Sequence, residues 1–308
     1  MLTVKDLIKH YPLKAGRFST SAEKIHALNG VSFTLGNRQT LGIVGESGCG
    51  KSTLAKTVLG IQNPDSGKII LDPADTRMQY IFQDPYLSLN PKMQVKDIIT
   101  EPMLASKMIT RREVTREAEQ LLELVGLPKD WGTKYPHEFS GGQRQRICIG
   151  RAISSKPGIV ICDEPVSSLD VSIQSQILNL LLELQEKLEI SYIFIAHNIA
   201  VVLYMSDIVS VMYAGYIVES APPQELYANP MHPYTKLLLS VVPEIGKKKR
   251  IFEQKIMGEV PDLIHMEAGC PFYSRCPVHK DICRSAIPQL KPGEKTEHSC
   301  ACWLYQIK

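Results

Sequence analysis

Short apolar runs recur along the chain up to about residue 200, and they alternate with longer stretches of helical periodicity. Apolar runs of this length, bounded by glycine or polar segments, are typical of buried β-strands. The expected strands are 31–35, 41–44, 68–71, 78–82, 159–162 and 192–196. Because strands that alternate with helices build parallel sheets, the pattern predicts an α/β core around a largely parallel sheet.

Two longer stretches, 111–125 and 172–188, place apolar residues on one face of a helix. Such faces usually pack into a core. No strand pattern occurs between about 86 and 157, so we expect a helical subdomain inserted into the α/β core there. The pattern changes again after about residue 240. We therefore expect a main domain over 1–240 and a small C-terminal extension over 241–308.

Composition narrows the class of protein. The chain is 44% hydrophobic and 22% charged, as ordinary globular proteins are, and its net charge of +3 is too small to indicate a nucleic-acid partner. The strongest apolar window, 208–218, is broken by polar residues and glycine, and a membrane-spanning helix needs about 18 apolar residues. The N-terminus has no basic region followed by an apolar core. We expect a soluble, intracellular chain.

Residues 45–52, with the sequence GESGCGKS, lie between the expected strand 41–44 and an expected helix over 53–59. In this context the backbone N–H groups of a glycine-rich loop surround a polyphosphate. Lys51 supplies a positive charge for the β- and γ-phosphates, and the Ser52 hydroxyl can ligate Mg²⁺. The expected nucleotide-binding positions are Gly45, Ser47, Gly48, Cys49, Gly50, Lys51, Ser52 and Thr53.

One loop position carries a thiol. Cys49 lies near the N-terminus of the expected helix, where the local potential is positive and favours a thiolate. We therefore expect Cys49 to be more acidic than Cys162, which lies within an expected strand.

Two acids end the expected strand 159–162, namely Asp163 and Glu164. At a nucleotide site this arrangement places one carboxylate near Mg²⁺ and the next near the attacking water. The alternative is a buried strand capped by two solvated acids.

A second phosphate-binding end is expected at residues 139–146, with the sequence FSGGQRQR. A serine and two glycines at a helix start expose N–H groups to an anion. Because the loop 45–52 already supplies one such end, this one is most economically used by the nucleotide of a partner chain. The residues concerned are Ser140, Gly141, Gly142 and Gln143.

In their order, these motifs resemble the nucleotide-binding subunits of ABC transporters. That family has a glutamine where its helical subdomain begins, matched by Gln83, and a Ser-x-Leu-Asp loop, matched by residues 167–170 and ending at Asp170. Its switch histidine is matched by His197. The resemblance implies a P-loop NTPase cassette with a RecA-like core, which hydrolyses ATP as a head-to-tail dimer.

The resemblance also implies roles for single residues. Glu164 would act as general base or polarise the attacking water, Gln83 and His197 would sense the γ-phosphate, and Ser52, Asp163 and Gln83 would orient Mg²⁺. An aromatic residue upstream of the phosphate loop stacks on adenine in this family, and Tyr11 is the best match. Tyr11 could equally be a packing residue.

Cysteines accumulate in the C-terminal extension, which holds five of the eight: Cys270, Cys276, Cys283, Cys300 and Cys302. In a reducing compartment clustered thiolates suggest a metal more than disulfides. Their spacing fits no common zinc-finger pattern. Zinc and reduced, unliganded cysteines remain alternatives.

Three segments of the chain's end, 230–236, 269–276 and 301–303, are similar to the C-terminal extension of the oligopeptide/dipeptide and related nickel ABC importers. Residues 10–16 and 83–91 look like the second of the two paired ATPase subunits. In that family four cysteines can hold a 4Fe-4S cluster, which would here serve a structural role. By motif they would be Cys270, Cys276, Cys283 and Cys302, with Cys300 an extra thiol.

The resemblance implies a second ABC ATPase subunit, two transmembrane permease subunits and an extracytoplasmic substrate-binding protein, at the cytoplasmic face of the inner membrane. The imported solute would be a peptide, with nickel or another small solute as the alternative. A soluble ABC ATPase outside transport would carry two cassettes or a long coiled-coil insertion, and this sequence has neither. A redox protein would need its cluster near the chemistry, whereas the cysteines lie far in sequence from the nucleotide motifs.

Overall fold

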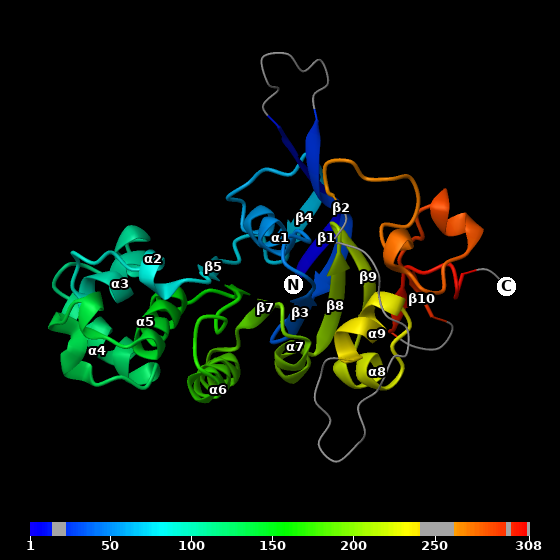
Figure 1. Ribbon diagram of the computed structural model, residues 1–308. Coiled ribbons are helices and arrows are strands. Elements are labelled where there is room, and N and C mark those ends of the chain that lie inside the picture. Colours follow the sequence, from blue (N-terminus) through cyan, green and yellow to red (C-terminus); the bar gives the residue numbers. More distant parts are fainter. Residues whose placement is uncertain (14–22, 241–261, 294–296, 307–308) are drawn as a thin grey trace. The chain divides into compact units, whose positions relative to one another are not determined.

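The computed structural model describes residues 1–13, 23–240, 262–293 and 297–306, and it divides into two compact units (Figure 1). Unit 1 comprises Met1 and residues 35–40 and 71–195, and unit 2 comprises residues 2–34, 41–70 and 196–308. The expected boundary at residue 241 falls in the stretch 241–261, outside the described residues.

Unit 1 contains three parallel strands in the order β7-β6-β5. They are β5 (Met78–Ile81), β6 (Ile159–Asp163) and β7 (Ser191–Ala196). Every residue of β6 and β7 is buried, which explains why both strands are continuous apolar runs in the sequence. The strands expected at 78–82, 159–162 and 192–196 are confirmed.

Between β5 and β6 the chain forms only helices and 3₁₀ turns, as expected for 86–157 (Figure 1, cyan to green). The helices are α2 (Pro85–Ser88), α3 (Val95–Ala105), α4 (Val114–Leu124) and α5 (Gly141–Ser154), with 3₁₀ turns at Lys129–Thr133 and Pro136–Glu138. Helix α3 packs against α4 and α5. After β6, α6 (Val171–Leu188) buries Ile177, Leu181 and Leu184, as its periodicity predicts.

Unit 2 contains a three-stranded sheet in the order β2-β1-β4, made of β1 (Leu2–Pro12), β2 (Lys24–Leu35) and β4 (Ser66–Leu71). A second set of strands begins with β3 (Thr40–Val44), which pairs in parallel with β8 (Ile208–Tyr213). Strand β8 then pairs antiparallel with β9 (Tyr216–Ala221). The expected largely parallel sheet is therefore correct for β3 and β8, but the pairing of β8 with β9 was not expected.

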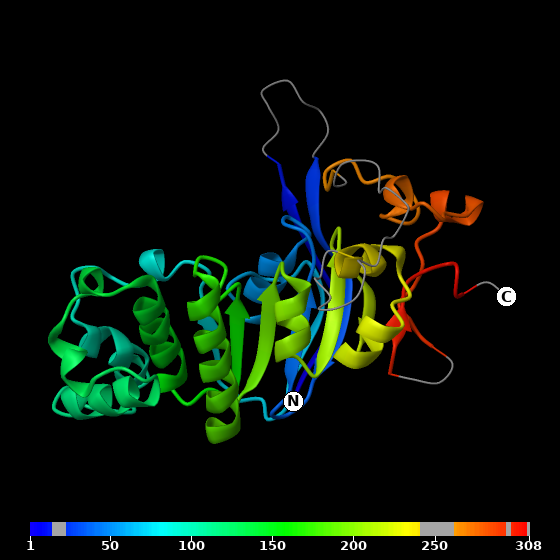
Figure 2. The same cartoon turned by 60° about the horizontal axis from the view of Figure 1, so that its bottom comes forward.

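The described residues of unit 2 form the α-helices α1 (Lys51–Val58), α7 (Ile199–Met205), α8 (Pro223–Ala228) and α9 (Pro233–Ser240). Helix α8 contacts α7, β8 and β9 (Figure 2). The end of the chain adds the 3₁₀ turns Tyr273–Arg275 and Asp281–Arg284 and the short strands β10 (Lys291–Pro292) and β11 (Ser299–Cys300). In the part of the chain that the structure describes, no helix is long and apolar enough to cross a membrane.

A buried carboxylate ties the end of the chain to the rest of unit 2. Glu219 on β9 is fully buried, and Oε1 accepts hydrogen bonds from the Met231 amide at 2.6 Å and His298 Nε2 at 2.7 Å. Its Oε2 accepts the His232 amide at 2.8 Å. These bonds fix the start of α9 and the approach to β11. They also satisfy the carboxylate, since a buried charge is stable only when it is paired and hydrogen-bonded.

Candidate functional site

The phosphate loop lies between β3 and α1 in unit 2, as predicted. Two of its glycines make close backbone contacts: a Cβ at Gly45 would lie 2.2 Å from the Met212 carbonyl oxygen, and one at Gly50 would lie 2.2 Å from that of Ala27. Gly50 also caps α1 with a φ of 105°, which side chains rarely allow. No other residue type fits either position without moving the backbone.

Lys51, the first residue of α1, is buried against this loop. Its Nζ donates to the carbonyl oxygen of Gly45 at 2.8 Å and to that of Glu46 at 2.9 Å. Ser47, Gly48 and Ser52 are exposed at the loop and the first helical turn. An ammonium group and a helix N-terminus at the same loop favour an anion.

Burial has the largest effect on the acidity of the thiol in this loop. Cys49 is 3% exposed, and burial raises its pKa although the nearby Lys51 charge acts in the opposite direction. Burial likewise raises the pKa of Cys162. The positive potential of the loop therefore does not make Cys49 an acidic thiol, because desolvation of the thiolate is the larger effect.

Tyr11 lies near the end of β1, and its hydroxyl donates a short hydrogen bond to Gln62 Oε1, just after α1. Its ring is half-buried, and Lys9 Nζ lies 5.7 Å from the ring centre. This contact anchors the aromatic residue in the unit that holds the phosphate loop.

The cysteine-rich segment reaches the phosphate loop, which the sequence did not predict. Arg275, next to Cys276, pairs with the Glu46 carboxylate through Nη1 at 2.8 Å and Nη2 at 3.1 Å. The cysteines lie far in sequence from the nucleotide motifs, but their neighbour Arg275 reaches the phosphate loop. No local pattern in the sequence signals this pair.

Unit 1 holds the two acids that follow the β6 strand core. Tyr80 on β5 donates a hydrogen bond to Asp163 Oδ2 at 2.5 Å, and both residues are buried. Asp163 Oδ1 is also buried and has no hydrogen-bond partner among the described residues. An unpartnered carboxylate oxygen is a hard ligand of the kind that Mg²⁺ prefers, so the residue fits the role that its position predicts.

Glu164 and Gln83 lie together in unit 1. Gln83 Nε2 donates to Glu164 Oε2 at 3.2 Å. Glu164 has a φ of 50°, in the left-handed region, and its amide donates to the Ile195 carbonyl oxygen at 2.9 Å. Such a backbone conformation in a residue other than glycine is costly and is often found at functional sites.

The expected second phosphate-binding end begins α5. Ser140 caps this helix: the Gln143 amide donates to Ser140 Oγ at 3.4 Å, and Gln143 Oε1 accepts from the Ser140 amide at 3.0 Å. Gly142 has a packing role as well, because a Cβ there would lie 2.5 Å from Ile173 of α6. Asp170 caps α6 through the Ile173 amide at 3.0 Å.

His197 directly follows β7, as its motif predicts, and its side chain is exposed. It belongs to unit 2, with Lys51 and Ser52, whereas Gln83, Asp163 and Glu164 belong to unit 1. Within unit 1 the structure brings Gln83 into contact with Glu164. Within unit 2 it brings Lys51 into contact with the phosphate loop.

The five cysteines of the C-terminal extension, Cys300 included, lie within electrostatic reach of one another. Burial raises the pKa of Cys270 to about 12, and the charges of Cys283, Cys302 and Cys276 raise it too. Burial also raises the pKa of Cys302 to about 11. Across the described ranges, however, no three His, Cys, Asp or Glu side chains form a group that could hold a metal ion, so the expected cluster finds no support there.

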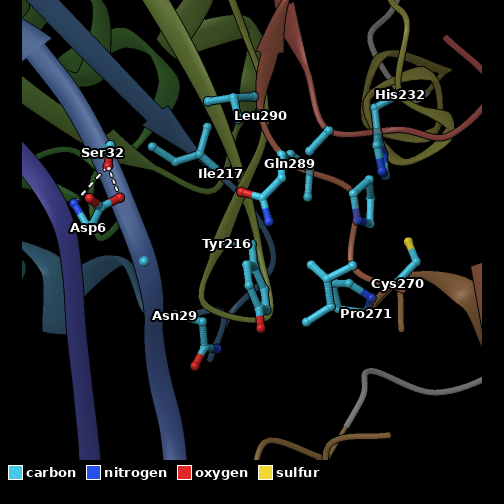
Figure 3. A pocket seen from close by; sticks show the side chains of 15 residues that line it. Asp6, Asn29, Ser32, Tyr216, Ile217, His232, Cys270, Pro271, Gln289 and Leu290 are labelled. Carbon is cyan, nitrogen blue, oxygen red and sulfur yellow. Dashed lines mark hydrogen bonds between the residues drawn. The ribbon is translucent and has the colours of Figure 1, made fainter. Parts of the chain in front are cut away.

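A separate cavity of about 380 Å³ lies in unit 2 between the three-stranded sheet, β9 and the C-terminal segment (Figure 3). The side chains of Gln289 and His232 border it, together with Tyr216 and Cys270. Burial lowers the pKa of His232 to about 4, so its imidazole is neutral. The described residues that line it include no lysine or arginine, which distinguishes this cavity from the phosphate loop.

Comparison with known proteins places the chain among transport ATPases. A family described as ABC transporter matches residues 28–167, and the C-terminal region of oligopeptide/dipeptide transporters matches residues 218–283. The oligopeptide transport ATP-binding protein AppF of Bacillus subtilis is 44% identical over 321 residues, which cover 99% of this chain and 97% of the relative. The di/tripeptide transport ATP-binding protein DppF of Pseudomonas aeruginosa is 42% identical, with 97% of both chains covered.

Solved structures agree on the fold. The structure of cbiO1 from Clostridium perfringens, part of the ABC transporter complex cbiONQ, has a TM-score of 0.62 at 28% identity and covers 74% of this chain and 90% of that chain. MJ0796, a bacterial ABC transporter cassette solved as a dimer, has a TM-score of 0.63 at 23% identity and covers 72% and 99%. The predicted α/β cassette is thereby confirmed.

Proposed function

Because this chain belongs to the ABC transporter ATPases that carry an oligopeptide/dipeptide transporter C-terminal region, we propose that it powers peptide import as one nucleotide-binding subunit of an ABC importer. Its reaction is ATP hydrolysis. The choice of a peptide as the solute rests on the match of residues 218–283 to the C-terminal region of oligopeptide/dipeptide transporters, in the same chain as the cassette.

In the proposed mechanism the phosphate loop binds ATP through its N–H groups and Lys51. The Lys51 ammonium is already fixed beside the loop by two carbonyl oxygens, so it needs little reorganisation to meet the β- and γ-phosphates. Ser52 and Asp163 would hold Mg²⁺, and Gln83 would help to orient it. When bound, Mg²⁺ neutralises developing charge on the phosphates.

Glu164 is assigned the role of general base or water-polarising group. Its hydrogen bond with Gln83 supports this assignment, because an amide donor orients the carboxylate. Gln83 and His197 sense the γ-phosphate, and Tyr11 stacks on adenine. Ser140, Gly141, Gly142 and Gln143 bind the nucleotide held by the other subunit of a head-to-tail dimer, next to the Asp170 loop.

The proposed partners are a second ATPase subunit, two permease subunits and an extracytoplasmic binding protein, with this chain at the cytoplasmic face of the membrane. Exposed apolar side chains beside Gln83 support contact with a permease: Tyr86 is 58% exposed and Leu87 is 87% exposed. Clustered exposed apolar residues mark protein interaction sites. The chain would be the second, F-type, member of the pair, with its main domain over 1–240 and its extension over 241–308.

We also propose that Cys270, Cys276, Cys283 and Cys302 hold a 4Fe-4S cluster. These thiols lie near enough to influence one another's pKa, and the Cys270 amide donates to the Cys283 carbonyl oxygen at 2.8 Å. Because the described side chains do not form a metal-holding group as they stand, they would have to reorient around the cluster. The cluster would cross-link and stabilise the C-terminal extension, which has little hydrophobic core of its own. Zinc, held by the same cysteines, is the competing metal.

Uptake in living cells tests the proposed solute. Deletion of this subunit in an amino-acid auxotroph should abolish growth on a dipeptide that contains the required amino acid, while growth on the free amino acid continues. Restoring the parent chain should restore growth, and restoring the Lys51→Ala variant should not. If deletion instead lowers only nickel accumulation, the importer carries nickel. If the chain fails to co-purify with membrane subunits, a role outside transport is indicated.

A further inference from the structure

The C-terminal extension provides a side chain to the ATP site. We propose that Arg275 is a positioning residue for the phosphate loop, which holds Glu46 in place and thereby sets the affinity for ATP. The inference rests on ATP binding at the loop, but it does not depend on which solute is imported.

The contact between the two residues is specific in geometry. Two guanidinium nitrogens of Arg275 meet the two carboxylate oxygens of Glu46, Nη1 with Oε2 at 2.8 Å and Nη2 with Oε1 at 3.1 Å. Parallel, charge-assisted bonds of this kind are stronger and more directional than a single ion pair. The Arg275 side chain is 9% exposed and that of Glu46 25%, so water screens the pair only partly.

Aromatic residues hold the guanidinium group in this position. Its central carbon lies 5.7 Å from the ring centre of Tyr213 and 5.8 Å from that of Phe272, and Nη1 donates to the Tyr213 hydroxyl at 3.3 Å. Tyr213, Tyr234 and Phe272 pack on one another. Arg275 therefore approaches the loop from a rigid platform and not from a solvated tail.

The carboxylate, the amide and the carbonyl group of Glu46 each have a hydrogen-bond partner. Its carboxylate binds Arg275, its amide donates to the Tyr234 hydroxyl at 2.8 Å, and its carbonyl oxygen accepts from Lys51 Nζ at 2.9 Å. The position of this one loop residue and that of the phosphate-binding ammonium are therefore set together. Because the geometry of a binding loop must be held closely, releasing the carboxylate should weaken ATP binding.

The turn that carries Arg275 is braced by its own backbone. The Tyr273 amide donates to the Cys270 carbonyl oxygen at 2.9 Å, and the Cys276 amide donates to that of Tyr273 at 3.2 Å. The segment from Cys270 to Cys276 thus delivers the guanidinium group to the loop. In this way the extension becomes part of the nucleotide site.

Calorimetric titration of the purified full-length chain with MgATP tests the proposal. Arg275→Gln should raise Kd about tenfold, equivalent to about 1.4 kcal/mol. Arg275→Lys, which keeps the charge but not the fork, should give an intermediate loss. In steady-state hydrolysis the KM for ATP should rise while kcat stays near that of the parent. ATP binding by the parent chain is measured in the same series, so a general absence of ATP binding is told apart from a failure of Arg275.

Two further variants sharpen the result. Arg284→Gln removes the same charge from an exposed site in the same extension and should leave Kd unchanged. In a double-mutant cycle, adding Arg275→Gln to Glu46→Gln should cause little further loss, since the contact is already broken. A merely structural role would lower the unfolding midpoint and kcat together, but not the affinity of the folded fraction. Unchanged affinity in folded Arg275→Gln or Arg275→Lys protein, or an equal loss in Arg284→Gln, would overturn the proposal.

Discussion

The Tyr80 hydroxyl donates a hydrogen bond to Asp163 Oδ2 across neighbouring parallel strands, with 2.5 Å between the two oxygens. The tyrosine satisfies one carboxylate oxygen and leaves Oδ1 without a partner among the described residues. A carboxylate fixed through one oxygen presents the other in a defined direction. Tyr80 thus orients the residue that we assign to Mg²⁺.

We expect Tyr80→Phe to raise the Mg²⁺ concentration needed for half-maximal ATP hydrolysis several-fold, because Asp163 loses its fixed orientation. The free energy of unfolding should fall by about 1–3 kcal/mol, since a buried oxygen loses its donor. Tyr192→Phe is the matched control: this buried tyrosine donates to the Leu181 carbonyl oxygen at 3.0 Å. An equal change in Mg²⁺ dependence in both variants would exclude the orienting role.

The Glu164→Gln variant should bind ATP but turn over about 10²–10⁴-fold more slowly, because an amide cannot accept the proton of the attacking water. ATP should then trap the closed dimer, which size-exclusion chromatography with ATP detects. Hydrolysis near the parental rate in the purified complex would remove Glu164 from the catalytic role.

Metal analysis tests the cysteine proposal. Serine at Cys270, Cys276, Cys283 or Cys302 should reduce the iron and sulfide content of anaerobically purified protein, because a lost ligand opens the cluster to solvent. Cys300→Ser is the control and should keep its iron, since Cys300 lies in β11 and is not among the expected ligands. Stoichiometric zinc without sulfide would rule out the cluster.

The buried Glu219–His298 pair predicts a pH dependence of stability. Burial acts to lower the pKa of His298, but its contacts with Glu219 and Glu225 outweigh that effect and raise it above the ordinary value. A raised pKa in the folded state stabilises below the unfolded value of about 6.5, and this contribution is lost as pH rises through the folded value.

Urea titrations at pH 6 and pH 8.5 should therefore show that His298→Gln costs more at the lower pH. The loss there should be about 2–3 kcal/mol, the size of a hydrogen bond to a buried charge. His265→Gln, at an exposed histidine paired with Asp262, should cost much less than His298→Gln, because water screens surface ion pairs. A pH-independent cost at His298 would contradict the charged pair.

Much of the fold follows from the sequence because buried parallel strands and amphipathic helices leave clear periodic patterns. The apolar runs became β3, β6 and β7, and the stripe at 172–188 became α6. Strand β1 was missed because its polar and apolar positions are interleaved. Nearly half of its residues are only partly buried, so they form no continuous apolar run. Strand β9 was missed because Glu219, a buried charge on it, interrupts the apolar pattern.

The residues of the candidate site also fall into those that the sequence predicts and those that it does not. Lys51, Asp163 and Glu164 were found because their chemistry requires a fixed local order of residue types along the chain. Tyr80 and Arg275 were not found, because each acts through a partner far away in sequence: Tyr80 through Asp163, and Arg275 through Glu46. Packing alone brings such partners together, and no local spacing records it.

Strands β10 and β11 have a consequence beyond nucleotide chemistry. Strand β11 pairs with β9 at Ser299↔Ser220 and Cys300↔Glu219, and the Ala301 amide extends this contact to the Val218 carbonyl oxygen at 2.8 Å. Long unpaired sheet edges invite aggregation, and very short edge strands protect against it. Here β11 covers the open edge of β9 and β10 follows it, and each is two residues long. The pairing of β11 thus keeps the otherwise open edge of β9 from pairing with a foreign strand, and deletion of residues 299–308 should make the purified protein more prone to aggregate.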